Sequence, residues 1–459
     1  MAECPFTPPF PTPLTRKPGL IRRFRLGWSS WIHTLHERTY SMKMGGTQLP
    51  GHGVYILNEL PEIKRLLENA GDEFPKHPIF DDLLTPLVGS SVFNANGAEW
   101  ERLRAMVNPA FMHTHLQRAF PVMAGAVADL IARMRAEATR GEPVDVDPMM
   151  THVAADVIFR TMFSVPLAQA DALRVYREFE AYQALAQRNT LLTLYGLPHF
   201  GLRRRARKVG ARIREAFDGI VAGRIAARER GEQFSDILET LLDTRHPDTG
   251  AAFEHQDLVN QVTLIFFGGH ETTATSLGWT LYLLSESPEL QERLNAEIES
   301  VTGGGPLAYA HLRLLEGVRN LYRESLRLYP PVSFLPRAAT HAMAMRGKAI
   351  KPGDLLLAAP WLVHRNPDNW ECPHQFDPDR FTTPAGAEAA KQAWMPFGKG
   401  PRVCIGAGFA TQESTMTLVE IIRAFRISHP DGPRPEVTAR LTLRPKAGFP
   451  LILTPRAGN

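Results

Sequence analysis

The chain has 459 residues, 44% of them hydrophobic and 22% charged, which is an ordinary globular composition and excludes a disordered, collagen-like or coiled-coil protein. It is long enough to bury a large core and to enclose a ligand. With 52 Lys and Arg against 48 Asp and Glu, the net charge of +4 is too small to indicate a nucleic-acid-binding protein.

Three cysteines, Cys4, Cys372 and Cys404, are too few for a disulfide scaffold or for a four-cysteine iron–sulfur cluster. The first residues lack the charged start and apolar run of a signal peptide, and no apolar stretch is long enough to span a membrane. We therefore expect a reduced, cytoplasmic protein in which any cysteine chemistry depends on a single thiolate.

The N-terminal region is rich in proline over residues 1–20, which predicts an extended arm ahead of a single domain spanning 21–459. Between Glu3 and Glu37 the chain has basic residues but no acidic ones, interleaved with apolar side chains such as Ile21 and Trp28. This pattern favours a solvated basic helix with one buried face. Contact with an anionic membrane surface, at the inner side of the cell membrane, is the alternative.

The remaining elements alternate between long helices and short strands. The sequence predicts a hairpin over 40–58, a helix after Pro61 and a loop over 74–99. It then predicts helices near 100–114, 117–137, 149–163, 168–186, 203–230, 256–287, 287–302, 308–314, 316–328 and 406–425. Strands are expected in 40–58, 330–365 and 435–455, where the last residues, 441–455, read as a closing β hairpin. The expected fold is mainly helical with a smaller β region.

The segment 397–406, FGKGPRVCIG, carries the strongest chemical signal. Its glycines permit unusual backbone dihedrals and the close approach of a flat ligand. A cysteine near a helix start is favoured as a thiolate, and Arg402 adds positive charge beside it. Without a second cysteine or a paired histidine nearby, Cys404 fits an axial ligand of haem iron better than a zinc ligand.

This segment resembles the cysteine-ligand signature F-x-x-G-x-R-x-C-x-G of the cytochrome P450 family, with every fixed position filled. The resemblance implies a helix-rich triangular prism that holds haem b between the long central helix and the helix after the cysteine. It implies Cys404 as the axial thiolate and metal ligand. The surrounding cofactor-binding positions are Phe397, Gly398, Arg402 and Gly406.

The long helix carries GGHETT at 268–273, which is similar to the family's oxygen-activation motif. Small residues at Gly268 and Gly269 would let the helix pass close to a haem face. A threonine hydroxyl can bond to the carbonyl four residues earlier, and an adjacent carboxylate can relay protons. We therefore expect Glu271 and Thr272 to be the catalytic pair; a Gly-Gly kink with a capping threonine is the alternative.

Two further motifs resemble the family's structural core. Glu324 and Arg327 match its E-x-x-R, whose i, i+3 spacing places both side chains on one helix face. Arg380, in Pro378–Phe381, matches its P-E-R-F segment with Asp in place of Glu. The resemblance implies a buried network of these three residues that holds the cysteine loop against the helices.

The family also places basic and aromatic side chains at the haem propionates. Trp100 and Arg104, at i, i+4, match its W-x-x-x-R, and Arg337 matches the arginine that follows the E-x-x-R helix. Together with Arg402, this would give three arginines for two carboxylates.

The resemblance implies a dioxygen-dependent monooxygenase that hydroxylates a C–H bond. A peroxide-driven enzyme of the same fold and a non-catalytic haem-binding sensor are the alternatives. No flavin or iron–sulfur module follows the signature, so electrons would come from a ferredoxin or flavodoxin with its reductase, and NAD(P)H would act only indirectly. We expect no nucleic-acid partner and a monomer.

The expected substrate pocket is apolar, which favours a fatty acid, an alkane or a terpenoid. By their positions relative to the motifs, its candidate residues are Leu264, Phe267, Ser333, Phe334, Leu335 and Phe449. An apolar turn at 195–200, followed by a basic run at 203–208, falls where the family has its entrance lid. A solvated basic helix face is the favoured explanation of this turn and the basic arm, and contact with an anionic membrane is the alternative.

Overall fold

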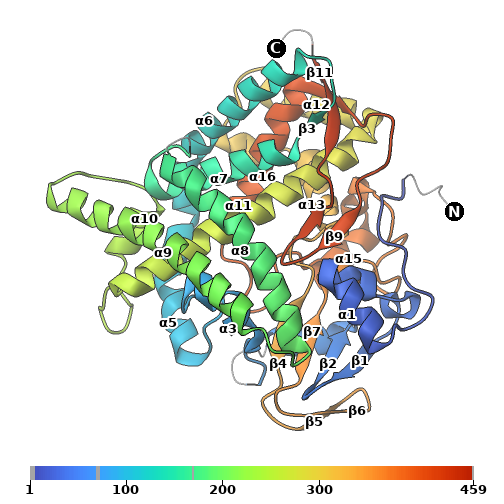
Figure 1. Cartoon of the computed structure of the whole chain (residues 1–459). Coiled ribbons are helices and arrows are strands. Elements are labelled where there is room, and N and C mark those ends of the chain that lie inside the picture. The colour runs from blue at the N-terminus through green and yellow to red at the C-terminus, as the bar shows by residue number, and fades with distance from the viewer. Residues whose placement is uncertain (1–5, 69–72, 168–169, 457–459) are drawn as a thin grey trace.

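The computed structural model describes residues 6–68, 73–167 and 170–456. Long helices form the larger part of the molecule; many of the strands lie at the lower right beside the N-terminal helix, and others lie at the top near the C-terminus (Figure 1). The principal helices are α1 (Leu20–Ser29), α2 (Leu60–Glu68), α3 (Ile79–Leu83), α4 (Thr85–Val88), α5 (Gly97–Val107), α6 (His113–Ala138), α7 (Asp147–Phe163), α8 (Ala170–Leu194), α9 (Phe200–Glu229), α10 (Ile237–Asp243), α11 (His255–Ser285), α12 (Pro288–Thr302), α13 (Glu316–Leu328), α14 (Pro360–Val363), α15 (Pro384–Ala393) and α16 (Ala407–Ala424).

Short 3-10 helices and strands complete the chain. The 3-10 helices are η1 (Trp31–Thr34), η2 (Glu37–Tyr40), η3 (Asn108–Phe111), η4 (Tyr309–Arg313) and η5 (Pro378–Thr382). The strands are β1 (Met44–Leu49), β2 (His52–Leu57), β3 (Val144–Asp145), β4 (Leu335–Ala338), β5 (Met343–Met345), β6 (Lys348–Ile350), β7 (Leu355–Ala358), β8 (Phe425–Ser428), β9 (Val437–Ala439), β10 (Leu443–Pro445) and β11 (Pro450–Pro455).

The largest sheet joins chain segments that are distant in sequence. Its order is β1-β2-β7-β4, with β1 and β2 paired as the expected hairpin and β2 parallel to β7. The carboxylate of Asp354 accepts a hydrogen bond from the Gly53 backbone at 2.6 Å, which fixes the hairpin against the later strands.

Two local predictions were wrong. The expected loop over 74–99 contains the short helices α3 and α4, because Leu83, Leu87 and Val88 are needed in the core. The closing segment does contain strands, but β10 pairs with β9 while β11 pairs with β8 and β3. The expected hairpin between β10 and β11 is therefore absent: each strand pairs with a different segment.

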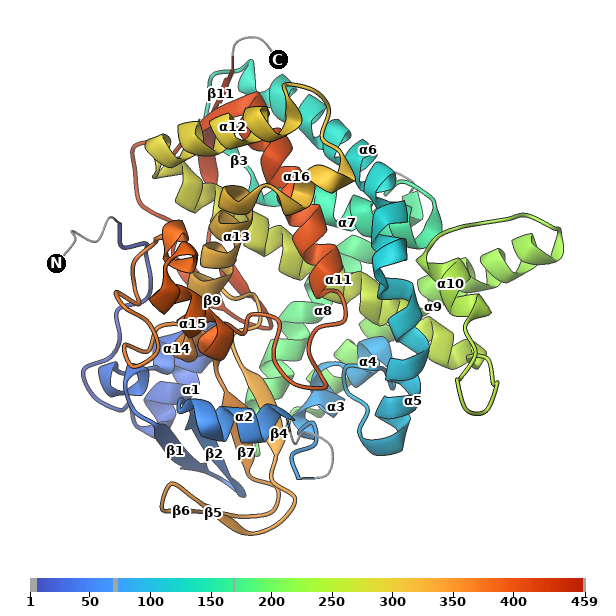
Figure 2. The same ribbon diagram turned by 180° about the vertical axis from the view of Figure 1, so that it is seen from behind.

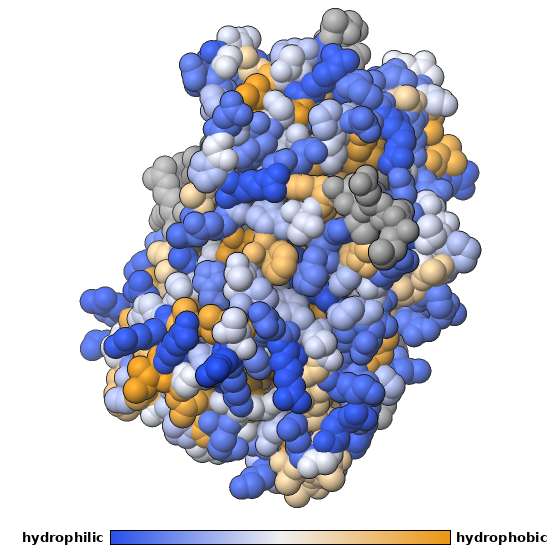
Figure 3. Space-filling view, turned by 90° about the vertical axis from the view of Figure 1, so that its right-hand side faces the viewer, coloured by the Kyte–Doolittle hydropathy of each residue, from blue (hydrophilic) through white to orange (hydrophobic). Residues whose placement is uncertain are grey.

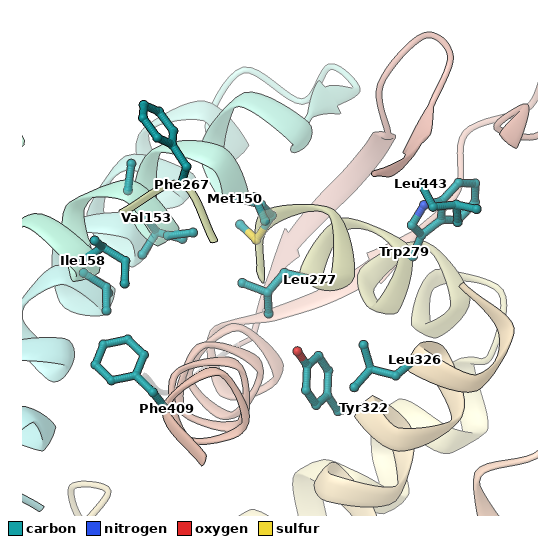
Figure 4. Close-up of a cluster of buried hydrophobic side chains, with 14 of the residues drawn as sticks. Met150, Val153, Ile158, Phe267, Leu277, Trp279, Tyr322, Leu326, Phe409 and Leu443 are labelled. Carbon is teal, nitrogen blue, oxygen red and sulfur yellow. The ribbon is translucent and has the colours of Figure 1, made fainter. Parts of the chain in front are cut away.

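The central helix α11 passes through the interior and packs on α7, α9, α13 and α16 (Figures 1 and 2). Beyond its first turn, almost every residue is buried. Figure 4 shows Met150 of α7 and Leu277 of α11 pointing toward one another, with Tyr322 of α13 and Phe409 of α16 on the side facing those helices. This core holds α11 in a fixed position relative to α13 and α16.

The predicted Glu324–Arg327–Arg380 network is present and buried. Arg327 donates from Nε and Nη2 to the Glu324 carboxylate, both at 2.8 Å, and Arg380 Nε donates to it at 3.0 Å. Burial opposes the ionised carboxylate, but the two guanidinium groups outweigh that effect and hold the pKa of Glu324 below its ordinary value. The pair is therefore charged at neutral pH.

The network extends from α13 to the cysteine loop through His364. Arg327 Nη1 donates to the His364 carbonyl at 2.8 Å, and His364 Nδ1 lies 3.0 Å from the Arg327 carbonyl. The backbone N–H of Met395, at the start of the loop, donates to His364 Nε2 at 2.9 Å. Burial lowers the pKa of His364 well below its ordinary value, so the ring is neutral and can accept from Met395 while it donates to Arg327.

Replacing Arg327 with Leu should leave the Glu324 carboxylate buried beside Arg380 alone, at a cost of about 3–5 kcal/mol in the free energy of unfolding. The denaturant midpoint measures this loss. Arg293→Leu is the control, because its ion pair with Asp379 is equally close, at 2.8 Å, but exposed. That change should cost less than about 1 kcal/mol; equal losses in the two variants would contradict a buried structural role.

Because the pKa of Glu324 is depressed, the contribution of the network to stability is present above the ordinary pKa of the carboxyl and is lost as the pH falls through the depressed value.

Candidate active site

The cysteine loop runs from α15 to α16 and is closed by backbone hydrogen bonds. The Cys404 N–H donates to the Phe397 carbonyl at 2.9 Å. Gly398 and Gly400 have φ of +77° and +74°, which other residues adopt at a cost. A Cβ on Gly400 would also lie 2.5 Å from the Leu67 carbonyl oxygen of α2. These positions require glycine, and they place Cys404 directly ahead of α16.

Cys404 is a free thiol with accessible surface, although protein atoms surround it closely. The sulfur therefore borders a space inside the molecule that water can enter. Burial raises the pKa of the Cys404 thiol, while the Gly406 backbone N–H and the charge of Arg104 oppose that rise. A metal ion would displace the proton, because coordinated thiols are deprotonated.

The oxygen-motif helix α11 has a single accessible stripe. After its first turn, the residues that are not buried are Leu264, Gly268, Gly269 and Thr272. Leu264, Gly268 and Thr272 are spaced by four residues and lie on one face. A Cβ on Gly268 would have no heavy atom within 4 Å. This face of a central helix therefore borders open space.

Thr272 and Glu271 use their side chains differently. The Thr272 hydroxyl donates to the Gly268 carbonyl at 2.7 Å, as expected from the motif. Glu271 is buried; it accepts from Thr442 Oγ1 at 2.6 Å and from Gln183, and Arg444 Nε lies 3.4 Å from the same carboxylate. Burial raises the pKa of Glu271, and Arg444 and the two hydrogen bonds only partly oppose that rise. The carboxyl is therefore more easily protonated than an exposed one.

Gly269 was expected to let the helix pass close to a haem face, but the structure gives its small size a different role. A Cβ at this position would lie 2.6 Å from Cδ1 of Ile158, which is buried on α7. The absent side chain allows α7 and α11 to pack closely, whereas Gly268 is the glycine that faces open space.

The predicted pocket residues divide into two groups. Phe334 and Leu335, at the start of β4, keep accessible surface. Leu335 faces the cysteine loop, because its Cδ1 would lie 3.8 Å from a Cβ built on Gly398. Phe449 is fully buried against Trp279, which corrects its placement at a pocket. Phe267 is also buried, with its ring stacked 3.9 Å from that of Phe179, and Ser333 is buried. These three side chains contribute to the core.

Arg337 and Arg402 belong to a cluster of cations. Arg402 lies over the Trp100 ring at 4.4 Å and donates to the Ala95 carbonyl at 2.9 Å. Arg337 is buried, its Nε has no hydrogen-bond partner in the described chain, and Nη1 donates only to the Pro336 carbonyl. Burial lowers the pKa of each guanidinium to about 10; the charge of Arg402 adds to the effect at Arg337, and that of Arg104 adds to it at Arg402.

Lys76 joins this cluster and was not found from the sequence. Burial lowers the pKa of Lys76 well below its ordinary value, and the charges of Arg337 and Arg402 lower it further. Its ammonium lies 4.3 Å from the centre of the Phe93 ring. A lone lysine in the apolar stretch FPKHPIF is the signal that could have indicated it.

No carboxylate pairs with Arg337, Arg402 or Lys76 in the described ranges. Arg337 is buried, and Lys76 and Arg402 are half-buried. Cations that are withdrawn from water without a counter-charge are unfavourable, so the cluster fits an anionic ligand. Three features suit a flat, anionic cofactor that carries a metal. They are the free thiol beside an internal space, the open face of α11 and this cationic cluster. The donor set therefore fits haem, with Cys404 toward the iron and the cations toward the propionates.

Comparison with known proteins agrees with this geometry. The family model for cytochrome P450 matches residues 21–452. A cyclooctat-9-en-7-ol 5-monooxygenase of Streptomyces melanosporofaciens is 30% identical over 83% of both chains. A cytochrome P450 of Paris polyphylla, CYP72A616, is also 30% identical, over 86% of this chain and 78% of its own length.

A solved structure has the same fold. The haem domain of cytochrome P450DA superimposes with a TM-score of 0.79 at 23% identity, covering 98% of this chain and 99% of that one. The match over nearly the whole chain confirms the mainly helical fold with its smaller β region. The chain belongs to the cytochrome P450 family, and it is a cytochrome P450 monooxygenase.

Proposed function

We propose that this monooxygenase hydroxylates a terpenoid or a similarly apolar, uncharged molecule, with electrons from a separate ferredoxin or flavodoxin and its reductase. The observation that carries the proposal is the accessible stripe of α11, which has Thr272 at one end and apolar Leu264 at the other. The apolar Leu335 lies next to the cysteine loop. Relatives that oxidise terpenoids support this substrate class.

Haem b, when bound through Cys404, supplies activation of dioxygen and oxidation of a C–H bond. Arg337, Arg402, Lys76 and Arg104 would bind its carboxylates. Leu264, Phe334 and Leu335 exclude water around an apolar substrate and hold it by contact.

The proton supply depends on Glu271. Its carboxyl can hold a proton because burial raises its pKa, and it can pass the proton on to the space beside Thr272. Thr442 and Arg444 connect this carboxyl to the exterior, since the Arg444 side chain is 23% exposed. The Thr272 hydroxyl already donates to the Gly268 carbonyl, so its oxygen is free to accept a hydrogen bond from the site.

Cofactor retention tests the cationic cluster. Arg337→Met and Lys76→Met should each increase the rate of haem loss to apomyoglobin about tenfold or more, because each removes a charge-assisted hydrogen bond of roughly 1.5–3 kcal/mol. Lys64→Met is the control, because this exposed lysine of α2 forms a single ion pair within the described residues, with Glu68 at 3.8 Å. An unchanged rate of haem loss in the Lys76 variant would show that Lys76 does not belong to the cofactor site.

Cys404→Ser should abolish the red-shifted Soret band of the reduced carbon monoxide complex.

The substrate class can be tested with pairs of compounds, an alcohol and a carboxylic acid, that share one carbon skeleton. The ferric spin-state shift should occur at lower concentrations of a cyclic terpenoid alcohol than of the matching carboxylic acid. An ionised carboxylate beside Leu264 and Leu335 would be desolvated without a cation of its own. Turnover with a surrogate ferredoxin and its reductase under labelled dioxygen should give an alcohol with one labelled oxygen. Tighter binding of the acid, or turnover with peroxide but with no electron donor, surrogate or native, would contradict the proposal.

Glu271→Gln tests the proton supply. The amide keeps the size of the side chain and can still accept from Thr442, but it cannot carry the proton and its NH2 group cannot accept from Gln183. Turnover should therefore fall about a hundredfold while the spin-state shift stays unchanged. Glu286→Gln, at the end of the same helix, is the matched control, because its carboxylate faces Tyr282 and Arg434 instead. Equal turnover in both variants would mean that the proton takes another route.

A further inference from the structure

The carboxyl of Glu271 receives contacts from two distant parts of the chain. Thr442 and Arg444, just before and within β10, both lie against Oε1, at 2.6 and 3.4 Å. Gln183 of α8 donates from Nε2 to the other oxygen, Oε2. Within the described residues, Gln183 is the only hydrogen-bond partner of Oε2. The proton supply proposed above does not yet use this contact.

Gln183 is positioned by the way α8 crosses α11. The Phe179 ring stacks on that of Phe267, with centres 3.9 Å apart, and meets the His270 ring edge to face at 5.1 Å. Gln183 lies one turn further along α8 on the same side, and it therefore reaches the carboxyl of Glu271 on α11. Glu271 is only 3% exposed, whereas Gln183 keeps accessible surface. The amide therefore stands between the buried carboxyl and a more open region.

The two oxygens of this carboxyl are not equivalent. A proton on Oε1 would be opposed by the Thr442 hydroxyl, which already donates to that oxygen, and by the positive charge of Arg444. A proton on Oε2 would meet only the neutral amide of Gln183. When Glu271 is protonated, its proton therefore belongs on Oε2, next to Gln183.

The Gln183 side chain can serve both protonation states of Glu271. Its amide carries two N–H donors and one carbonyl acceptor, and a half turn of the amide plane exchanges their places. The torsion concerned has broad minima, so the half turn costs little. An ionised carboxylate can only accept, and it takes the N–H donor. A protonated carboxyl can also donate, and it takes the carbonyl oxygen of the amide.

We propose that Gln183 is a positioning residue for the proton supply, and that it holds Oε2 of Glu271 in both protonation states by turning its amide between donor and acceptor. The inference rests on the proposed role of Glu271 as the proton donor. Glu271 then releases and regains its proton without losing its contact with α8, so its carboxyl keeps one position throughout turnover.

The charged groups around Glu271 decide how its carboxyl titrates. Burial raises its pKa, Arg444 and two hydrogen bonds oppose that rise, and Asp147, at the start of α7, adds to it. Burial and the charge of Arg444 lower the pKa of the neighbouring His270 to about 3, so that ring is neutral. Gln183 carries no charge. Replacing it with another neutral residue therefore changes the hydrogen bonding at Oε2 and leaves these charges as they are.

Gln183→Met in the holoenzyme tests the inference, because methionine matches glutamine in length but forms no comparable hydrogen bond. The ionised carboxylate loses more than the protonated carboxyl does, so the pKa of Glu271 should rise. Since proton donation requires the protonated form, the alkaline limb of the turnover profile should move up by about one pH unit. Turnover at neutral pH should fall about tenfold. The substrate concentration that gives half of the ferric spin-state shift should not change.

Gln183→Glu is the second variant. A second carboxyl beside Glu271 disfavours ionisation of the pair, so the alkaline limb should move further up than in Gln183→Met. When protonated, the new side chain offers both a donor and an acceptor, so turnover below the shifted limb should exceed that of Gln183→Met. A merely structural contact between α8 and α11 would lower turnover equally at every pH and would shift no limb.

Gln187→Met is the matched control. Gln187 lies one turn beyond Gln183 on α8, but its Nε2 donates at 3.2 Å to the Trp28 carbonyl of α1 instead of to α11. Helix α1 lies on the side of the molecule that Figure 3 faces, where apolar and strongly hydrophilic side chains are interleaved at the lower left. No helix in the described ranges is long and apolar enough to cross a bilayer. The control variant should keep the turnover profile of the unchanged enzyme.

The reduced carbon monoxide spectrum of each variant shows that it is folded. A turnover profile of Gln183→Met that matches that of Gln187→Met, or that is lower at every pH without a shift, would overturn the inference. Glu271→Gln separates this failure from failure of the proposed function. If Glu271→Gln leaves turnover unchanged, the proton supply itself is wrong. If it lowers turnover while Gln183→Met shifts no limb, only the role of Gln183 is wrong.

Discussion

The ion pair between Glu324 and Arg327 is the interaction on which the rest of the structure depends. Each residue is fully buried, and together they connect α13 to η5 and to the irregular segment between α14 and η5. Arg327 donates to the carbonyls of His364, Pro373 and Gln375, which turns an irregular segment into a fixed support. A buried ion pair adds little net stability, but it specifies one arrangement strongly, because every donor and acceptor needs a partner.

The same requirement explains how an irregular loop can hold Cys404 in a precise position. His364 transmits the position of Arg327 to Met395 through its two ring nitrogens. Gly400 then fits against the end of α2 only because it has no side chain. The cysteine is therefore positioned from two directions, by α13 through hydrogen bonds and by α2 through close packing.

Much of this arrangement could be predicted because short motifs report local chemistry. The i, i+3 spacing of Glu324 and Arg327 and the glycines around Cys404 have direct counterparts in the structure. Positions set by long-range packing could not be predicted in the same way. Phe449 was expected at the pocket from its position relative to the family's motifs. In the structure its ring fills the space beside Gly278, where a Cβ on Gly278 would lie 2.3 Å from the ring. The role of Lys76 depends on Arg337, more than 250 residues away in sequence, so the local stretch FPKHPIF can single out the lysine but cannot show its role.

The parallel pairing of β2 with β7 has a consequence for how the protein is made. The N-terminal hairpin gains this neighbour only after about three hundred further residues have been synthesised, and Gly53 then meets Asp354. Lys76 and Arg104 come from the early part of the chain, whereas Arg337, Arg402 and Cys404 come from the late part. A nascent chain that ends before residue 400 has Lys76, Arg104 and Arg337 but lacks Arg402 and Cys404. Until α16 has been synthesised, the face of α11 that packs on it stays uncovered and in need of protection from aggregation.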